Sequence, residues 1–205
     1  MLQEVRDKVG YRHIHLNREN RSIQLGKDGM QLDLGGIAKG YAADAMRAVL
    51  ADGGIRAAMV VSGGDVAVGT TPPEAAGWVV QVDPGEEFPG AKVSVSLRSQ
   101  AVSTSGAHRQ SVKIGGKTYS HIVDPRTGLG LTRQTAVSVI APSATESDSL
   151  ATAASLMETA EAVTFLSRRR RVSGRVFLPP KGVGQNGEIW STPGFALHLQ
   201  RPARG

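Results

Sequence analysis

The pattern of apolar and polar positions predicts an antiparallel sheet with a few helices packed on it. Short segments with alternating or continuous apolar residues recur along the chain, and glycine, proline or aspartate bounds most of them. The predicted strands cover residues 11–16, 22–25, 30–34, 57–62, 78–82, 92–97, 111–114, 117–123, 135–140, 175–178 and 195–199. This succession of segments is typical of the α+β class.

Two turns predict hairpins between neighbouring strands. The residues Lys27, Asp28 and Gly29 separate segments 22–25 and 30–34, so these segments are expected to pair. Gly115 and Gly116 separate segments 111–114 and 117–123, and both central positions of a tight hairpin turn favour a positive φ.

Three helices are predicted from helical spacing and end signals. The first covers residues 37–50 and stops at a Gly-Gly pair. Its expected buried stripe consists of Ile37, Ala38, Tyr41, Ala42, Ala45, Met46, Val49 and Leu50. The second begins after Pro142, with Ser143 or Thr145 as its cap, and runs through Met157. The third covers residues 159–168.

Composition narrows the class of protein. The chain has 205 residues, of which 40% are hydrophobic, and shows no internal repeat or linker, so residues 1–205 are expected to form one domain. It contains no cysteine, which excludes disulfides and thiolate metal sites. No run of apolar residues approaches the roughly 18–20 that cross a bilayer, so no transmembrane segment is expected.

The formal net charge of +6 favours an anionic partner. The densest basic cluster is Arg168–Arg171, which in a nucleic-acid-binding protein could contact phosphates. The two Trp, three Tyr and four Phe residues are scattered and form no evident stacking surface. A solvated helix end that complements the helix dipole is therefore the better interpretation, and no nucleic-acid partner is expected.

The segment Asp33-Leu34-Gly35-Gly36-Ile37-Ala38-Lys39-Gly40 is a candidate anion site. An acid precedes two glycines and the start of an amphipathic helix. Free N–H groups and the positive end of the helix dipole would then face an anion, and glycine would allow a phosphate to approach closely. The alternative is a tight turn with no ligand.

Asp148 and Thr152 are a candidate pair of metal ligands. They stand four residues apart, so a carboxylate and a hydroxyl share one face of the predicted helix, a face expected to be exposed. Magnesium prefers such oxygens and keeps positions for substrate phosphates. A surface coincidence without a metal is the alternative.

The hydroxyl-rich segment Ser103–Gly106 and the segment Tyr119–Gly128 are candidates for catalysis. A histidine such as His121 can accept a proton from an attacking hydroxyl near neutral pH. Hydroxyls and backbone amides can bind phosphate or the edges of a flavin. The alternative is a structural histidine beside an Asp-Pro turn.

Together these motifs resemble, in order, those of the FAD:protein FMN transferases, the ApbE family. The resemblance covers the run 33–44, the Gly63-Gly64-Asp65 turn, Thr104-Ser105-Gly106, the His-x-x-Asp-Pro-x-Thr-Gly segment from His121, and Asp148 with Thr152. It implies an α+β fold related to the T-fold. It also implies a magnesium-dependent transfer of the FMN moiety of FAD to a threonine hydroxyl of an acceptor flavoprotein, with release of AMP.

The resemblance also implies roles for individual residues. Mg²⁺ would be bound by Asp148, Thr152 and the backbone carbonyl of Gly36, and His121 would be the base near the acceptor threonine. The residues implied to contact FAD are Asp33, Lys39, Gly64, Thr104, Ser105, Gly106 and the backbone at Val123.

One departure from the family concerns the N-terminus. Family members usually carry a sizeable segment before residues 11–16, which supplies flavin-ring contacts, an export signal and a lipid anchor. The 205 residues show neither a signal core nor an anchor cysteine, although the family implies the cell envelope. We therefore expect an N-terminally short member. Two alternatives remain: a non-catalytic FAD-binding or flavin-delivery module, and an interaction module that uses Arg168–Arg171.

Overall fold

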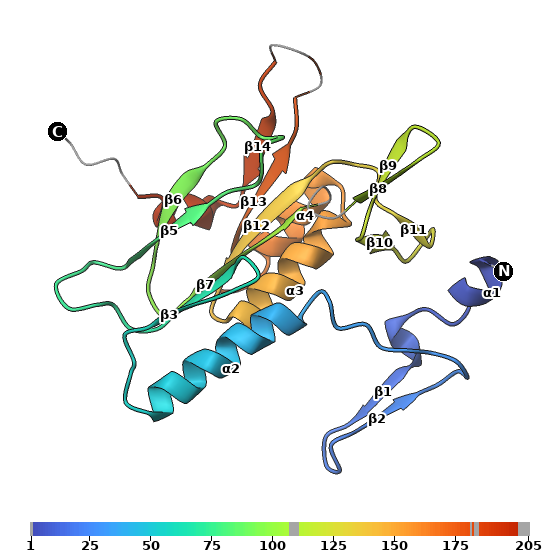
Figure 1. Ribbon diagram of the computed structural model, residues 1–205, viewed down its shortest axis with the longest axis horizontal. Coiled ribbons are helices and arrows are strands. Elements are labelled where there is room, and N and C mark those ends of the chain that lie inside the picture. Colours follow the sequence, from blue (N-terminus) through green and yellow to red (C-terminus); the bar gives the residue numbers. More distant parts are fainter. Residues whose placement is uncertain (1, 107–110, 181, 183–184, 201–205) are drawn as a thin grey trace.

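A six-stranded antiparallel sheet forms the centre of the molecule (Figure 1). The computed structural model describes residues 2–106, 111–180, 182 and 185–200. The strand order is β14-β13-β12-β7-β4-β3. The bounds are β3 Met59–Ser62, β4 Asp65–Val68, β7 Ala101–Gly106, β12 Ala136–Ala141, β13 Ser173–Leu178 and β14 Glu188–Ser191.

Three helices cover one face of this sheet: α2 (Ala38–Asp52), α3 (Ala144–Ser155) and α4 (Thr159–Ser167). Side chains alternate between the two faces of a strand, and in β12 Val137 and Val139 point to the helices. There they pack with Ala151 of α3 and Leu166 of α4. Burial of these apolar side chains fixes the helices on the sheet.

The opposite face is covered by the hairpin of β5 (Trp78–Val82) and β6 (Val93–Leu97) and by the 3₁₀ helix η2 (Pro193–His198). Ile140 and Phe177 of the sheet pack here with Leu97 and Phe195. The result is three layers, in which strands such as β12 are buried on both faces and the edge strand β14 is exposed.

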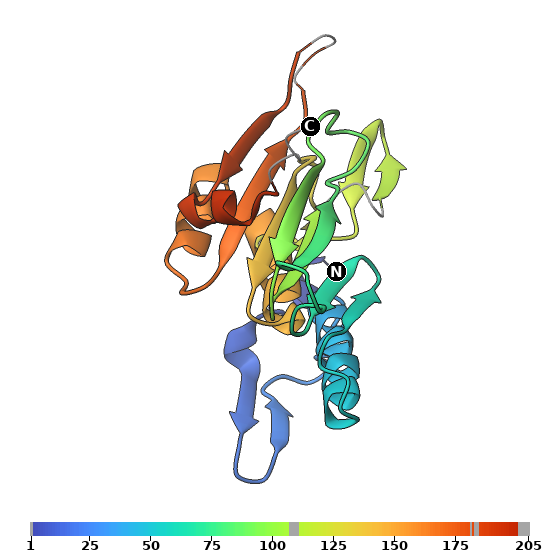
Figure 2. The same cartoon turned by 90° about the vertical axis from the view of Figure 1, so that its left-hand side faces the viewer.

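Smaller elements flank these layers. Before α2 come α1 (Leu2–Arg6), the 3₁₀ helix η1 (Tyr11–His13) and the hairpin of β1 (Ile14–Asn17) and β2 (Ser22–Leu25). This hairpin projects from the body of the molecule in both views (Figures 1 and 2). After β7 come β8 (Ser111–Ile114), β9 (Lys117–Ser120), β10 (Val123–Asp124) and β11 (Leu129–Gly130). Within the described ranges, no helix is long and apolar enough to cross a membrane.

The α+β class with an antiparallel sheet is confirmed, and most of the predicted elements are present, among them β5, β8, α3 and α4. Two predicted strands are wrong. Residues 30–34 form an irregular segment, and β2 pairs instead with β1 through a turn at residues 18–21. Residues 195–199 lie mostly in η2, where Pro193 precedes a 3₁₀ turn. The strands β4, β7 and β14 were not predicted.

The predicted buried stripe of α2 is also wrong. Tyr41 is 66% exposed and Val49 is 71% exposed, whereas Gly40 and Ala43 are buried. The reason is the close approach of α2 to α3, since a Cβ atom at position 40 would lie 2.1 Å from the carbonyl oxygen of Ala144. Only small residues fit such a contact, so the helix turns its larger apolar residues outward.

Candidate functional site

Most of the sequence-predicted site residues line one cavity of about 680 Å³. This volume is within the range of small-molecule sites. The start of α2, the end of β7, the segment before β10 and the middle of α3 all contribute to its wall. The lining residues are Asp33, Gly35, Gly36, Lys39, Gly63, Thr104, Ser105, Gly106, His121, Ile122, Val123, Thr152 and Leu156.

The glycine segment enters this wall just before α2. The Asp33 carboxylate accepts a hydrogen bond of 2.7 Å from the N–H of Gly35 and so shapes the turn. No side chain of the described residues caps the start of α2 at Ile37. The backbone of Gly36 lies against Thr152, because a Cβ atom at position 36 would be 3.1 Å from Thr152 Cγ2. This geometry suits an anion near the helix start.

Asp148 lies beneath the wall and is 1% exposed, so its expected position on an exposed helix face is wrong. The cause is again the contact between α3 and α2, which covers this side of α3. Asp148 Oδ2 accepts a hydrogen bond of 3.0 Å from the N–H of Gly40. The Lys39 ammonium lies 2.9 and 3.1 Å from the two carboxylate oxygens of Asp148.

Hydroxyl groups of β7 fix the orientation of α3. Ser103 and Ser147 are hydrogen-bonded at 2.7 Å, and Ser105 and Thr152 at 3.0 Å. Thr104 points to the other face of the sheet, and its hydroxyl bonds to Ser138 at 2.8 Å. Ser105 therefore positions the Thr152 hydroxyl, while the side chain of Thr104 forms its hydrogen bond within the sheet.

His121 is exposed at the edge of the cavity, in the bend that leads into β10. The bend is held by its own polar groups, since the N–H of Ile122 donates to the Ser120 hydroxyl at 3.1 Å. The Arg126 guanidinium donates to Asp124 and thereby holds the pKa of that carboxyl below its usual value. Arg126 also donates to the carbonyl of Leu156, which ties the bend to the end of α3.

Asp65 is a site residue that sequence reasoning missed, because the Gly63-Gly64-Asp65 run indicated only a turn. Asp65 is 3% exposed, and its Oδ2 lies 3.3 Å from Lys39 Nζ. Burial, and then the charge of Asp148, raise the pKa of Asp65, although Lys39 opposes this. Burial alone would lower the pKa of Lys39, but Asp148 and Asp65 outweigh it and raise that pKa. In the same turn, Gly63 lines the cavity and Gly64 does not.

The donors around Asp148 fit a hard cation. The carboxylate of Asp148, the hydroxyl of Thr152 and the carbonyl of Gly36 are all oxygen ligands, which magnesium prefers. The described residues contain no cluster of three or more histidine, aspartate or glutamate side chains that could hold a metal. An incomplete set of protein ligands suits a cation that also binds the oxygens of a substrate phosphate.

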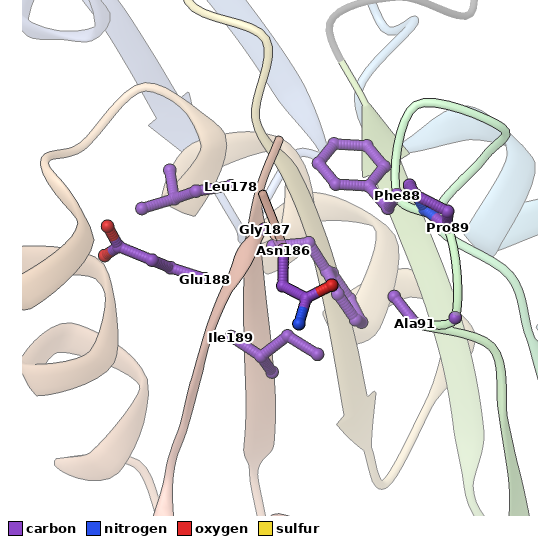
Figure 3. Close-up of a pocket in the computed structure, with 10 residues that line it drawn as sticks. Phe88, Pro89, Ala91, Leu178, Asn186, Gly187, Glu188 and Ile189 are labelled. Atoms are coloured by element: carbon purple, nitrogen blue, oxygen red, sulfur yellow. The ribbon is translucent and has the colours of Figure 1, made fainter. Parts of the chain in front are cut away.

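A smaller cavity of about 270 Å³ lies elsewhere, between the loop of residues 83–92 and the hairpin of β13 and β14 (Figure 3). Phe88 and Pro89 form one wall, and Leu178 and Ile189 form the other. None of the sequence-predicted site residues lines it, so the larger cavity is the candidate active site.

Comparisons with known proteins agree on one family. The FAD:protein FMN transferase of Treponema pallidum is 32% identical over 89% of this chain and 54% of its own length. That of Escherichia coli K12 is 27% identical over 97% of this chain and 56% of its own. The chain thus spans about half the length of the curated relatives it matches.

Solved structures of ApbE proteins also have a fold similar to that of this chain. The ApbE protein of Thermotoga maritima superposes with a TM-score of 0.82 and 29% identity, over 98% of this chain and 63% of that protein. The model of the ApbE family matches residues 1–176, which include every residue of the cavity wall. With its sequence motifs gathered around one cavity, the chain belongs to the ApbE family.

Proposed function

We propose that this chain transfers the FMN moiety of FAD to a threonine hydroxyl of an acceptor flavoprotein, with Mg²⁺ bound and with release of AMP. The observation that carries the proposal is the shared cavity of His121, Gly36 and Thr152, with Asp148 directly beneath it. The names of the relatives, FAD:protein FMN transferase, support the choice of substrate and product.

In the proposed reaction the acceptor threonine attacks the phosphorus on the flavin side of the FAD diphosphate. A P–O bond forms to the threonine oxygen, and the bond between that phosphorus and the bridging oxygen breaks. The bridging oxygen leaves with AMP, and the proton of the threonine passes to His121. A positioned base of this kind contributes about 10²- to 10⁴-fold to the rate.

The residues around the diphosphate stabilise its negative charge. Gly35 and Gly36, just before α2, line the cavity together with Lys39, so the positive end of the α2 dipole and the Lys39 ammonium would stabilise a diphosphate there. Mg²⁺, held by Asp148, Thr152 and the Gly36 carbonyl, would supply charge neutralisation at the phosphate oxygens. Ser105 keeps the Thr152 hydroxyl in place through their hydrogen bond.

The proposal is tested by incubating the chain with FAD, Mg²⁺ and an acceptor protein and measuring covalent FMN by mass spectrometry. His121→Asn should bind FAD as the parent does and transfer roughly 10²- to 10⁴-fold more slowly. His15→Asn, in an exposed part of the projecting hairpin, is the matched control and should transfer at the parent rate. Parent-like transfer by His121→Asn would exclude His121 as the base.

A non-catalytic FAD-binding module is the second candidate. It is favoured by one observation: within the part of the chain that the structure describes, the residues that line the cavity include no Phe, Tyr or Trp on which a flavin ring could stack. This candidate predicts FAD binding without any covalent FMN on the acceptor, in the same assay.

A further inference from the structure

Lys39, Asp65 and Asp148 form a charge cluster under the candidate active site, in which both carboxylates are buried. Lys39 reaches them from the first turn of α2 by passing over Gly63, where a Cβ atom would lie 2.9 Å from Lys39 Cδ. Its ammonium lies 2.9 Å from Asp148 Oδ1 and 3.3 Å from Asp65 Oδ2. One ammonium thus bridges a carboxylate of α3 and a carboxylate of β4.

This cluster has too little positive charge for its two carboxylates. The side chains of Asp65 and Asp148 are 4% and 1% exposed, so water compensates neither. Asp148 Oδ2 has the Gly40 N–H as a donor, whereas Asp65 Oδ2 has the Lys39 ammonium at 3.3 Å without the geometry of a good hydrogen bond. Buried carboxylates in this state attract a second cation strongly.

Lys39 is placed to make room for such a cation. Its side chain is 43% exposed and lines the cavity, so the ammonium can leave Asp148 without crossing the core. Asp148, in contrast, is held by the contact between α2 and α3. A divalent cation that binds Asp148 must compete with the ammonium already there.

We propose that Lys39 is a resident counter-ion that a divalent cation displaces from Asp148. Asp65 is the positioning residue of this exchange, because it retains the ammonium at the cavity wall once Asp148 has gained the cation. The freed ammonium then faces the diphosphate. That last step rests on the proposed function, whereas the exchange of cations does not.

The test is calorimetric titration of Mg²⁺ into the protein without flavin or acceptor. Lys39→Met removes the competing charge and keeps most of the length of the side chain, so it should bind Mg²⁺ roughly tenfold or more tightly than the parent. Arg126→Met is the matched control: it removes a charge near the cavity, at the carbonyl of Leu156, without touching Asp148. It should change Mg²⁺ affinity far less.

Asp65→Asn separates an exchange from a direct ligand role. In the parent it leaves the ammonium only Asp148 as a partner, so Mg²⁺ binding should weaken by roughly tenfold. In the Lys39→Met background most of that effect should disappear, because no ammonium is left to displace. This variant also keeps the Lys39–Asp148 pair, so it folds even if Lys39→Met, with two uncompensated carboxylates, does not.

Three results would overturn the exchange. They are Mg²⁺ binding by Lys39→Met no tighter than by the parent, an Asp65→Asn effect of equal size in both backgrounds, and no Mg²⁺ binding by any of these proteins. Thermal melting with and without Mg²⁺ provides an independent readout, since Mg²⁺ should raise the melting temperature of Lys39→Met more than that of the parent. A failure of FMN transfer alone would leave these results intact and would count only against the proposed function.

Discussion

At the scale of single residues, the carboxylate of Asp148 contributes to folding as well as to the site. It accepts hydrogen bonds from the Gly40 N–H and the Lys39 ammonium, both of α2. Asp148→Ala leaves that N–H without its acceptor and should lower the free energy of unfolding by about 1–3 kcal/mol, besides abolishing Mg²⁺ binding.

Urea unfolding and calorimetry of the same variant measure both effects of Asp148→Ala. Ser149→Ala is the control on the same helix, because the Ser149 hydroxyl bonds only to carbonyls of α3. It should change unfolding by no more than about 0.5 kcal/mol. If Asp148→Ala were as stable as the parent, the packing of α2 against α3 would not depend on this carboxylate.

His198 links stability to pH. Burial in η2 lowers its pKa, although a backbone hydrogen bond with Ser96 opposes the shift. The unfolded chain, with a histidine pKa of about 6.5, therefore binds the proton more readily than the folded protein does. Stability is greatest above pH 6.5 or so and is lost as the pH falls through the lower folded value.

Urea midpoints between about pH 7.5 and 5 check this dependence. His198→Gln should remove part of the slope below about pH 6.5. If the parent and His198→Gln showed the same slope, groups other than His198 would cause the loss of stability at low pH.

At the scale of secondary-structure elements, the contact between α2 and α3 depends on Gly40. Alanine inside a helix is normally more favourable than glycine, by about 1 kcal/mol. At position 40, however, the Cβ atom would meet the Ala144 carbonyl at 2.1 Å and Asp148 Cβ at 2.8 Å. Gly40→Ala should therefore destabilise the protein by about 1–3 kcal/mol and weaken Mg²⁺ binding.

Thermal melting is the measurement, and Gly53→Ala at the end of the same helix is the matched control. A Cβ atom at Gly53 has its nearest neighbour at 3.4 Å, an ordinary contact. A loss of about 1–3 kcal/mol corresponds to several degrees in a chain of this size. If Gly40→Ala melted at or above the temperature of Gly53→Ala, the inference that the close approach of α2 and α3 requires glycine at position 40 would be wrong.

At the scale of the whole molecule, the cavity wall suits the diphosphate of the proposed FAD substrate better than its flavin ring. Lys39 and the start of α2 suit an anion, whereas the lining residues that the structure describes include no Phe, Tyr or Trp on which a ring could stack. Stacking of a ring on an aromatic side chain is worth about 1–3 kcal/mol, and the wall lacks it. With Mg²⁺, these 205 residues should bind ADP within about tenfold of FAD.

Paired calorimetric titrations with FAD and ADP, each with and without Mg²⁺, measure this difference. Asp148→Asn serves as the control, because it should remove the Mg²⁺ dependence from both ligands alike. FAD binding more than about a hundredfold tighter than ADP binding would show that the ring has a complete pocket in this chain.

Local sequence determined several strands, a helix cap and the order of the motifs, because each of these depends on residues that lie close together in the chain. Short apolar segments predicted β5 and β8, and Ser143, one of the two expected caps with Thr145, caps α3 by accepting from the N–H of Glu146. The order of the motifs along the chain resembled that of the ApbE family, and the match of the family model to residues 1–176 confirms the family. Strand period, capping and motif order all act over short sequence distances, so they can be recognised without a fold.

Tertiary structure alone decided which of these residues meet and which are buried. Asp65 lies near Asp148 because α3 packs on the sheet that contains β4, over a sequence separation that no local pattern spans. The predicted buried stripe of α2 is wrong because the spacing of apolar residues does not show how closely a neighbouring helix approaches. That distance depends on glycine at position 40, whose missing side chain allows two backbones to touch.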